Sequence, residues 1–217
     1  MRAWTSVRTT KPLLFALCLA PLAVLLWRGF SGRLGANPIE FVTHATGDWT
    51  MRFLLISLTI TPARKILGIP ELIRYRRMLG VFAFFYGLLH FLTYIWLDRF
   101  FDLRDLIEDA GKRPFITAGF AAFVLLIPLA ATSTRGWIRR LGGKRWQRLH
   151  RLVYVSGIAA CIHYYWLVKS DIRAPLAYAA VLAALLCWRA ALWVRARRAR
   201  HFTILYSPTG LLGRRRL

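Results

Sequence analysis

The sequence predicts an all-α membrane protein, a polytopic helical bundle with about six transmembrane helices. Its 217 residues are 57% hydrophobic and have a mean hydropathy of +0.44, although the formal net charge is +23. The apolar residues fall in long runs that nearly exclude charge, and most runs approach the roughly 20 residues that a helix needs to cross a bilayer. The six runs are Pro12 to Trp27, Phe53 to Pro62, Met78 to Leu97, Phe115 to Thr132, Leu152 to Val168 and Ala174 to Val194.

The first two runs depart from the simple pattern of a membrane span. The first follows three basic residues, as a signal peptide does, but it continues through Trp27 to Arg28 without the short A-x-A-like site of a cleavable signal. We therefore expect a retained first helix. The second run is the weakest, because Arg52 and Pro62 bracket it closely, and without it the count would be five.

Two of the connecting segments carry helix signals of their own. Asn37, Pro38 and Glu40 read as an N-cap, a proline at the first helical position and an acid at the third. They predict a short interfacial helix that stops at Gly47 and carries His44 as a solvated surface histidine. The segment from Asp98 to Arg113 has apolar residues at helical spacing among its charges, which fits an amphipathic helix or a solvated turn.

The distribution of charge predicts the orientation. If the N-terminus is inside, the inner segments hold 23 of the 32 basic residues and one of the nine acidic residues, a net charge of +22 against +1 outside. Short cytoplasmic loops collect Lys and Arg, so we expect both termini in the cytoplasm. The basic residues form separate clusters between the runs, which favours anionic membrane lipids as partners and no nucleic acid.

The connecting segments are too short for a second hydrophobic core, which predicts a single domain over residues 1–217. We find no glycine-rich phosphate loop, so a nucleotide-binding or catalytic module would be another protein. The inner loop from Arg135 to Arg151 holds seven basic residues. Topology explains this charge, and a flavin phosphate or an acidic donor protein would favour the same surface.

Two histidines are the strongest functional signal. His90 and His163 lie inside different apolar runs, twelve residues after Met78 and eleven after Leu152, so both are expected in the outer half of the membrane. An ionisable ring is expensive to keep in hydrocarbon, and two imidazoles from facing helices are axial ligands for haem iron. We expect small residues before each histidine, among them Gly87 and Gly157, to leave space for the macrocycle. The alternative is that each ring only hydrogen-bonds a neighbouring helix.

His150 is a third candidate ligand, at the inner mouth of the helix that carries His163. Thirteen residues separate the two, roughly 20 Å along a straight helix and about 140° around it. A bend at Gly157, or a separate inner site, would reconcile the two directions. Met78 is the available thioether at that depth, and Arg77 is better suited to haem propionates or lipid phosphates. The three cysteines lie within the runs without a CxxC or CxxCH pattern, so any haem is bound without thioether attachment.

Two blocks of sequence resemble a known family. They are RRMLG through FFY to LHF at residues 76–91, and WQRLHRLVY with His163 and Tyr164 at residues 146–164. They resemble the haem-binding membrane subunit of the bacterial protein-methionine-sulfoxide reductase system, in the wider ferric-reductase and NADPH-oxidase transmembrane group. The resemblance covers nearly the whole chain. His90, His150 and His163 match the family's haem-associated histidines, whereas Arg77 stands where the wider group has an inner histidine.

The resemblance implies one or two b-type haems as cofactors, with FMN as a further candidate. It implies that the chain takes electrons from the quinone pool or a cytoplasmic flavin reductase. The electrons would pass to a periplasmic molybdopterin-containing methionine sulfoxide reductase that forms a heterodimer with this chain. That partner would repair oxidised envelope proteins. The chain itself would be an electron-transfer subunit without catalytic residues. The alternatives are a stand-alone ferric reductase component and a transporter or structural membrane protein without redox chemistry.

Overall fold

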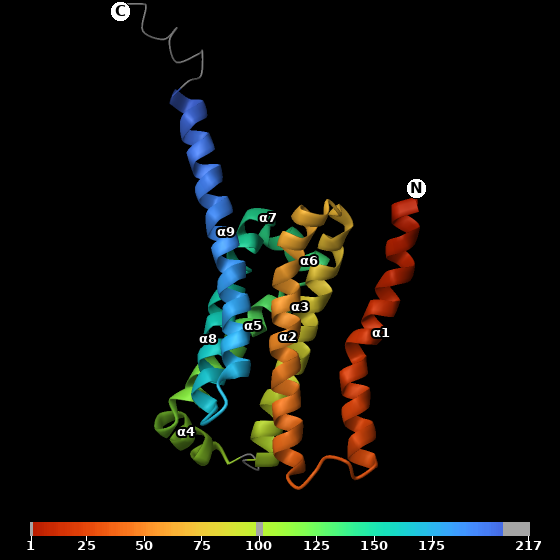
Figure 1. Cartoon of the computed structure of the whole chain (residues 1–217), viewed down its shortest axis with the longest axis vertical. Helices are drawn as coiled ribbons and strands as arrows, with labels where there is room; N and C mark the ends of the chain where they lie inside the picture. The colour runs from red at the N-terminus through yellow and green to blue at the C-terminus, as the bar shows by residue number, and fades with distance from the viewer. Residues whose placement is uncertain (1, 99–101, 206–217) are drawn as a thin grey trace, which may run out of the picture.

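The computed structural model describes residues 2–98 and 102–205, and these ranges consist of helices joined by short connections, without a β-strand (Figure 1). In chain order the elements are α1 (Arg2–Phe30), α2 (Pro38–Leu67), the 3-10 turn η1 (Pro70–Leu72), α3 (Ile73–Leu92), the π-helical segment η2 (Thr93–Asp98), α4 (Leu103–Lys112), α5 (Pro114–Ala131), α6 (Arg135–Leu141), α7 (Gly143–Leu149), α8 (Leu152–Leu167) and α9 (Arg173–Leu205). The all-α membrane bundle predicted from the sequence is confirmed.

The six predicted runs lie on α1, α2, α3, α5, α8 and α9. Among the described residues, four helical ranges are long and apolar enough to cross a membrane: Thr9–Phe30, Pro70–Leu97, Pro114–Ala131 and Arg173–Arg198. The helix α2 is continuous, but the charged residues Asp48 and Arg52 interrupt its apolar stretch. α8 has only 16 residues. Both nevertheless run alongside the longer helices (Figure 1). That α2 and α8 also cross the membrane, and that the spans number six, therefore stay predictions.

The expected short helix ending at Gly47 is wrong. α2 begins as predicted, with the Asn37 side chain accepting a hydrogen bond from the Glu40 backbone N–H at 3.3 Å. It then continues through Gly47 to Leu67 and ends at Gly68, which adopts the left-handed conformation with φ of 66°. A single glycine inside a helix costs only about 1 kcal/mol relative to alanine, so Gly47 does not end α2. The segment from Asp98 to Arg113 is expected to form either an amphipathic helix or a solvated turn. It contains the helix α4.

The bundle is built from two closely packed helix pairs, α2 with α3 and α5 with α8. α9 covers α2 and α8, and α1 lies at the edge against α2 and α3. The main core joins α1, α2, α3 and α5 through buried residues that include Leu54, Phe82 and Tyr86. Tyr86 is fully buried and ties α1 to α3, since its hydroxyl donates to the Cys18 carbonyl at 2.9 Å. A second cluster joins α2 to α9 through Leu58 and Leu182.

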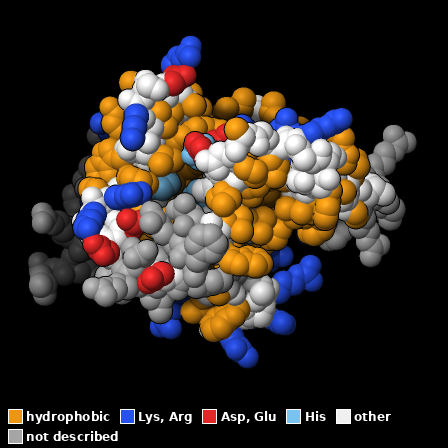
Figure 2. All heavy atoms as spheres, turned by 90° about the horizontal axis from the view of Figure 1, so that it is seen from below, with side chains coloured by type: hydrophobic (Ala, Val, Ile, Leu, Met, Phe, Trp, Pro, Cys, Tyr) orange, Lys and Arg blue, Asp and Glu red, His pale blue; other side chains and the backbone are white. Residues whose placement is uncertain are grey.

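The two ends of the bundle carry different connecting segments. Figure 1 places the start of α1, the described end of α9, and the basic helices α6 and α7 at one end, and α4 with the α1–α2 connection at the other. Figure 2 looks onto this second end, where acidic side chains are visible beside basic ones around a largely hydrophobic flank. We refer to the end with α4 as the outer end and to the end with α6 and α7 as the inner end.

Candidate functional site

The structure brings His90 and His163 together. His90 lies in the last turn of α3, and His163 lies about one turn before the end of α8. Their ring centroids are 6.0 Å apart, with the ring planes inclined at 75°. Both histidines therefore lie toward the outer end of the bundle, as their positions in the two runs predict.

Each of these two rings is held by a hydrogen bond to a neighbouring helix. Nδ1 of His90 is 2.9 Å from the Thr43 carbonyl oxygen on α2, and Nδ1 of His163 is 2.7 Å from the Phe115 carbonyl oxygen on α5. A carbonyl oxygen only accepts hydrogen bonds, so Nδ1 carries the proton and donates in both cases. Nε2 of each neutral ring then keeps its lone pair, which is the form in which histidine binds metals.

The spacing of the rings fits a haem between them. Each ring nitrogen lies about 2 Å from the metal in an imidazole complex and about 1 Å from its own ring centre, so two axial imidazoles have centroids about 6 Å apart. The observed 6.0 Å meets this requirement. No group of three or more metal-binding side chains occurs among the described residues. A haem asks for two axial protein ligands only, because the macrocycle supplies the remaining nitrogens.

The small residues that precede the histidines do not open space for a cofactor, contrary to the expectation from the sequence. A β-carbon on Gly87 would lie 3.4 Å from Thr50 on α2, and one on Gly157 would lie 3.4 Å from Leu182 on α9. Ser156 is fully buried and donates to the Ala122 carbonyl of α5 at 2.9 Å. These residues bring helices close together, which is the other role of small residues in membranes.

The residues that sequence reasoning missed lie on the facing helices. Gly47 of α2 is in contact with the His90 ring, and Gly119 of α5 is in contact with the His163 ring. The only signal in the sequence is a glycine inside a helical run, which weakens a helix and so asks for a packing or functional reason. Their partners, the Thr43 and Phe115 carbonyls, are backbone groups that carry no residue-specific signal.

His150 lies at the inner end and does not continue the helix of His163, which corrects the expected geometry. α7 ends at Leu149 and α8 begins at Leu152, so His150 belongs to the turn between them. The chain changes direction there, and the angle calculated for one straight helix does not apply. The Gly157 bend is not needed.

The His150 ring is stacked on Trp146, with centroids 3.8 Å apart, and its Nδ1 donates to the Trp146 carbonyl at 3.1 Å. Its Nε2 is buried without a hydrogen-bond partner. Burial lowers the pKa of His150, and the nearby Arg76 guanidinium also lowers it, while the backbone carbonyls of Trp146 and of Leu129 on α5 act in the opposite direction. A buried polar atom left unsatisfied, such as this Nε2, usually signals a missing partner.

The other inner-end candidates lie apart from a paired site. Met78 packs against the main core, and the Arg77 side chain is exposed. Arg76 donates instead to the Thr61 hydroxyl at 3.2 Å. The described side chains supply no second histidine at this end.

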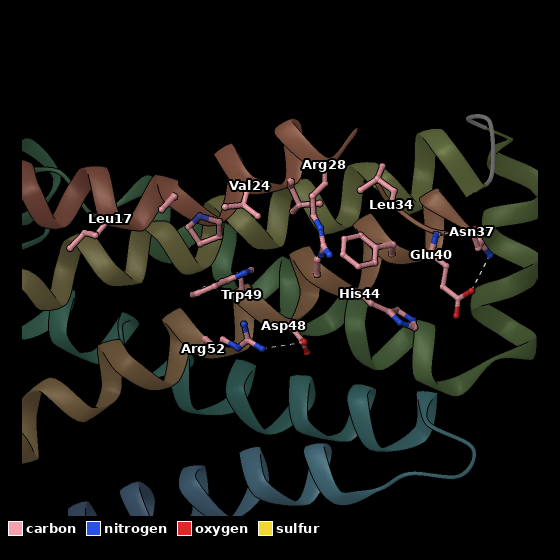
Figure 3. A pocket seen from close by; sticks show the side chains of 15 residues that line it. Leu17, Val24, Arg28, Leu34, Asn37, Glu40, His44, Asp48, Trp49 and Arg52 are labelled. Carbon is pink, nitrogen blue, oxygen red and sulfur yellow. Dashed lines mark hydrogen bonds and ion pairs between the residues drawn. The ribbon is translucent and has the colours of Figure 1, made fainter. Parts of the chain in front are cut away.

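A cleft of about 750 Å³ lies between α1 and α2 (Figure 3). Apart from Arg28, its α1 wall is apolar, with Leu17 and Val24. Its α2 wall carries His44, Asp48 and Arg52. His44 is exposed, as predicted for a surface histidine. The cleft is separate from the paired histidines, because α2 lines the cleft with one face and contacts His90 with another.

Comparisons with known proteins agree on one family. The sequence pattern described as ferric reductase like transmembrane component matches residues 46–161, a range that includes His90 and His150 and ends just before His163. A protein of Bordetella pertussis named protein-methionine-sulfoxide reductase heme-binding subunit MsrQ is 53% identical over 87% of this chain and 92% of its own length. Proteins of the same name from Herminiimonas arsenicoxydans and Caulobacter vibrioides are 51% and 53% identical over 88% and 82% of this chain, and over 88% and 84% of their own lengths. No solved structure matches.

Proposed function

This chain belongs to the family of protein-methionine-sulfoxide reductase haem-binding subunits, within the ferric reductase like transmembrane components, and we propose that it is a membrane electron-transfer protein that binds b-type haem. The observation that carries the proposal is the pair of neutral imidazoles with centroids 6.0 Å apart. His90 and His163 would be the axial ligands. A haem bound there supplies a one-electron carrier within the membrane.

The protein's own contribution is to hold both rings in the tautomer that leaves Nε2 without a proton. The Thr43 and Phe115 carbonyls accept the Nδ1 protons, which fixes the tautomer and the ring orientation. The surrounding aromatic side chains, including Phe91 stacked on Phe123 at 4.6 Å, keep this region apolar. An apolar surrounding limits the solvent reorganisation that an electron transfer requires.

His150 is proposed to serve electron input at the inner end, as a ligand of a second haem or as a contact of another cofactor. Its buried, unpartnered Nε2 and its stacking on Trp146 support this role. The electron donors proposed are the quinone pool or a cytoplasmic flavin reductase, and FMN is the proposed additional cofactor beside the basic α6–α7 segment.

The proposed electron acceptor is a periplasmic, molybdopterin-containing methionine sulfoxide reductase that forms a heterodimer with this chain. The names of the relatives support a catalytic partner, since each is called a subunit of a methionine sulfoxide reductase. The paired histidines lie toward the outer end, where the α1–α2 connection and α4 provide surfaces for such a partner. The process served is repair of oxidised envelope proteins.

We propose the bacterial inner membrane as the location, with both termini in the cytoplasm. Reporter fusions at Asp105, in α4, and after Leu217 should report opposite compartments, because α4 lies at the opposite end from α6, α7 and the start of α1. Reports of the same compartment would contradict the orientation and the six-span count together.

The function is tested in membrane vesicles that contain the full-length protein with a reductant on the cytoplasmic side. After the haem is reduced, addition of the purified periplasmic reductase and methionine sulfoxide should reoxidise it, and omission of either should leave it reduced. Reoxidation by ferric ions that ignores the partner would instead favour the stand-alone ferric reductase. A purified protein without any b-type spectrum would favour the transporter or structural alternative.

A further inference from the structure

We infer that Gly47 and Gly119 are positioning residues, which seat the two histidine rings and hold them in the orientation of a low-spin, bis-imidazole haem site. The inference rests on the proposed function, because it concerns how the ligands of that haem are oriented. It is carried by one geometry that occurs twice, in helix pairs distant in the sequence.

The repeated element combines a carbonyl and a glycine one helical turn apart. On α2, the Thr43 carbonyl accepts the Nδ1 hydrogen bond of His90, and Gly47 follows four residues later. On α5, the Phe115 carbonyl accepts the bond from the other ring, and Gly119 again follows four residues later. Residues four apart lie on the same face of a helix. Each ring is therefore held by the carbonyl of one turn and rests on the bare backbone of the next, an arrangement we call a histidine seat.

Only glycine leaves room for the ring in these seats. A β-carbon on Gly119 would lie 2.6 Å from Nδ1 and 2.9 Å from Cε1 of His163, well inside the roughly 3.5 Å at which such atoms normally touch. On Gly47 it would lie 3.1 Å from Nδ1 and Cε1 of His90, a milder conflict. Both positions are helix interiors, where glycine is otherwise unfavourable. The contact with the histidine ring explains why glycine occupies each of these two positions.

The seats determine a property that spectroscopy can read. They fix the ring planes at 75° to one another, close to perpendicular. Axial imidazoles in near-perpendicular planes give a ferric low-spin haem a strongly anisotropic EPR spectrum dominated by one low-field feature. Parallel planes give three resolved g values instead. A ring that is displaced from its seat thus changes the spectrum even where the haem stays bound.

The experiment compares four glycine variants of the full-length protein, purified in detergent with its haem. Gly119→Ala should lower haem affinity by about 10-fold to 100-fold, the usual effect of disturbing a group that orients a metal ligand. Its remaining haem should lose the anisotropic EPR feature. Gly47→Ala should move both measurements in the same direction by less. Gly87→Ala and Gly80→Ala should leave both at the wild-type value.

The two control variants separate seating from general helix packing. Gly87 lies one turn before His90 on α3, but its β-carbon would meet Thr50 and Phe123 at ordinary contact distances of 3.4 and 3.8 Å. Gly80, on the same helix, has nothing within 4 Å. Neither substitution reaches a histidine ring.

The outcomes separate the inference from the proposed function. Wild-type affinity and EPR spectrum in Gly119→Ala would overturn the seating role, as would equal losses in all four variants. If Gly119→Ala does not fold, the milder Gly47→Ala decides by the same two measurements, against Gly87→Ala. By contrast, a wild-type protein without b-type haem, or His163→Ala with unchanged absorbance, would refute the proposed haem site itself.

Discussion

The outer and inner ends of the bundle use histidine in different ways. At the outer end, His90 and His163 come from two helix pairs and face each other at 6.0 Å, each with its Nδ1 bonded to a carbonyl of a facing helix. At the inner end, His150 bonds the carbonyl of Trp146 within its own segment, and its Nε2 has no partner.

The difference lies in where the carbonyl that orients each histidine ring comes from. At the outer end the orienting carbonyls belong to other helices, so the packing of α2 on α3 and of α5 on α8 fixes both rings at once. At the inner end the orienting carbonyl of Trp146 lies four residues before the histidine, within the same short segment. Arg77, thirteen residues before His90, is exposed, so the inner end has one candidate ligand where the outer end has two.

The largest expected effect comes from breaking the outer pair. His90→Ala or His163→Ala should each remove most of the b-type absorbance, because one imidazole cannot complete the low-spin site. The reduced-minus-oxidised spectrum and the haem content per chain measure this, with membrane insertion checked by immunoblot. Full haem retention in both variants would show that the outer pair is not the haem site.

A smaller effect is expected from the inner end. His150→Ala should slow haem reduction from the cytoplasmic side several-fold while the absorbance due to the outer pair remains, since His150 contacts neither outer ring. Stopped-flow reduction in vesicles measures it. Gln147→Ala is the matched control, because Gln147 is an exposed neighbour on α7. If the two variants reduce at the same rate, His150 has only a structural role.

The smallest effect tests whether the helix pairs support the outer site through packing alone. Ser156→Ala removes the hydrogen bond from α8 to the Ala122 carbonyl of α5 and should destabilise the protein by about 0.5–1 kcal/mol. Thermal unfolding in detergent measures this. The haem spectrum should stay as in the wild type. A loss of haem as large as that of His163→Ala would mean that the α5–α8 contact as a whole, and not its seat, orients the ring.

Several features were predictable because they depend on local composition. The apolar runs, the charge asymmetry between the ends and the N-cap at Asn37 are properties of short stretches, and the structure bears out the helices at those runs and the cap. The two histidine blocks were specific enough to identify the family, which the comparisons confirm. The helix boundaries at Gly47 and at His150 were wrong, because a single glycine weakens a helix without necessarily ending it, and a helical periodicity does not reveal a two-residue turn.

The sequence by itself determined the class of protein, because the burial of apolar runs in a bilayer needs only hydrophobicity and length. It also determined which ionisable rings lie in those runs. Only the tertiary structure decided that His90 and His163 meet, that Gly47 and Gly119 touch their rings, and that Gly87 serves helix packing. These contacts join residues far apart in the chain through backbone carbonyls and bare backbone, groups that every residue or every glycine possesses. Their role depends on which helices pack together, and the helix pairing cannot be read from any short stretch of the sequence.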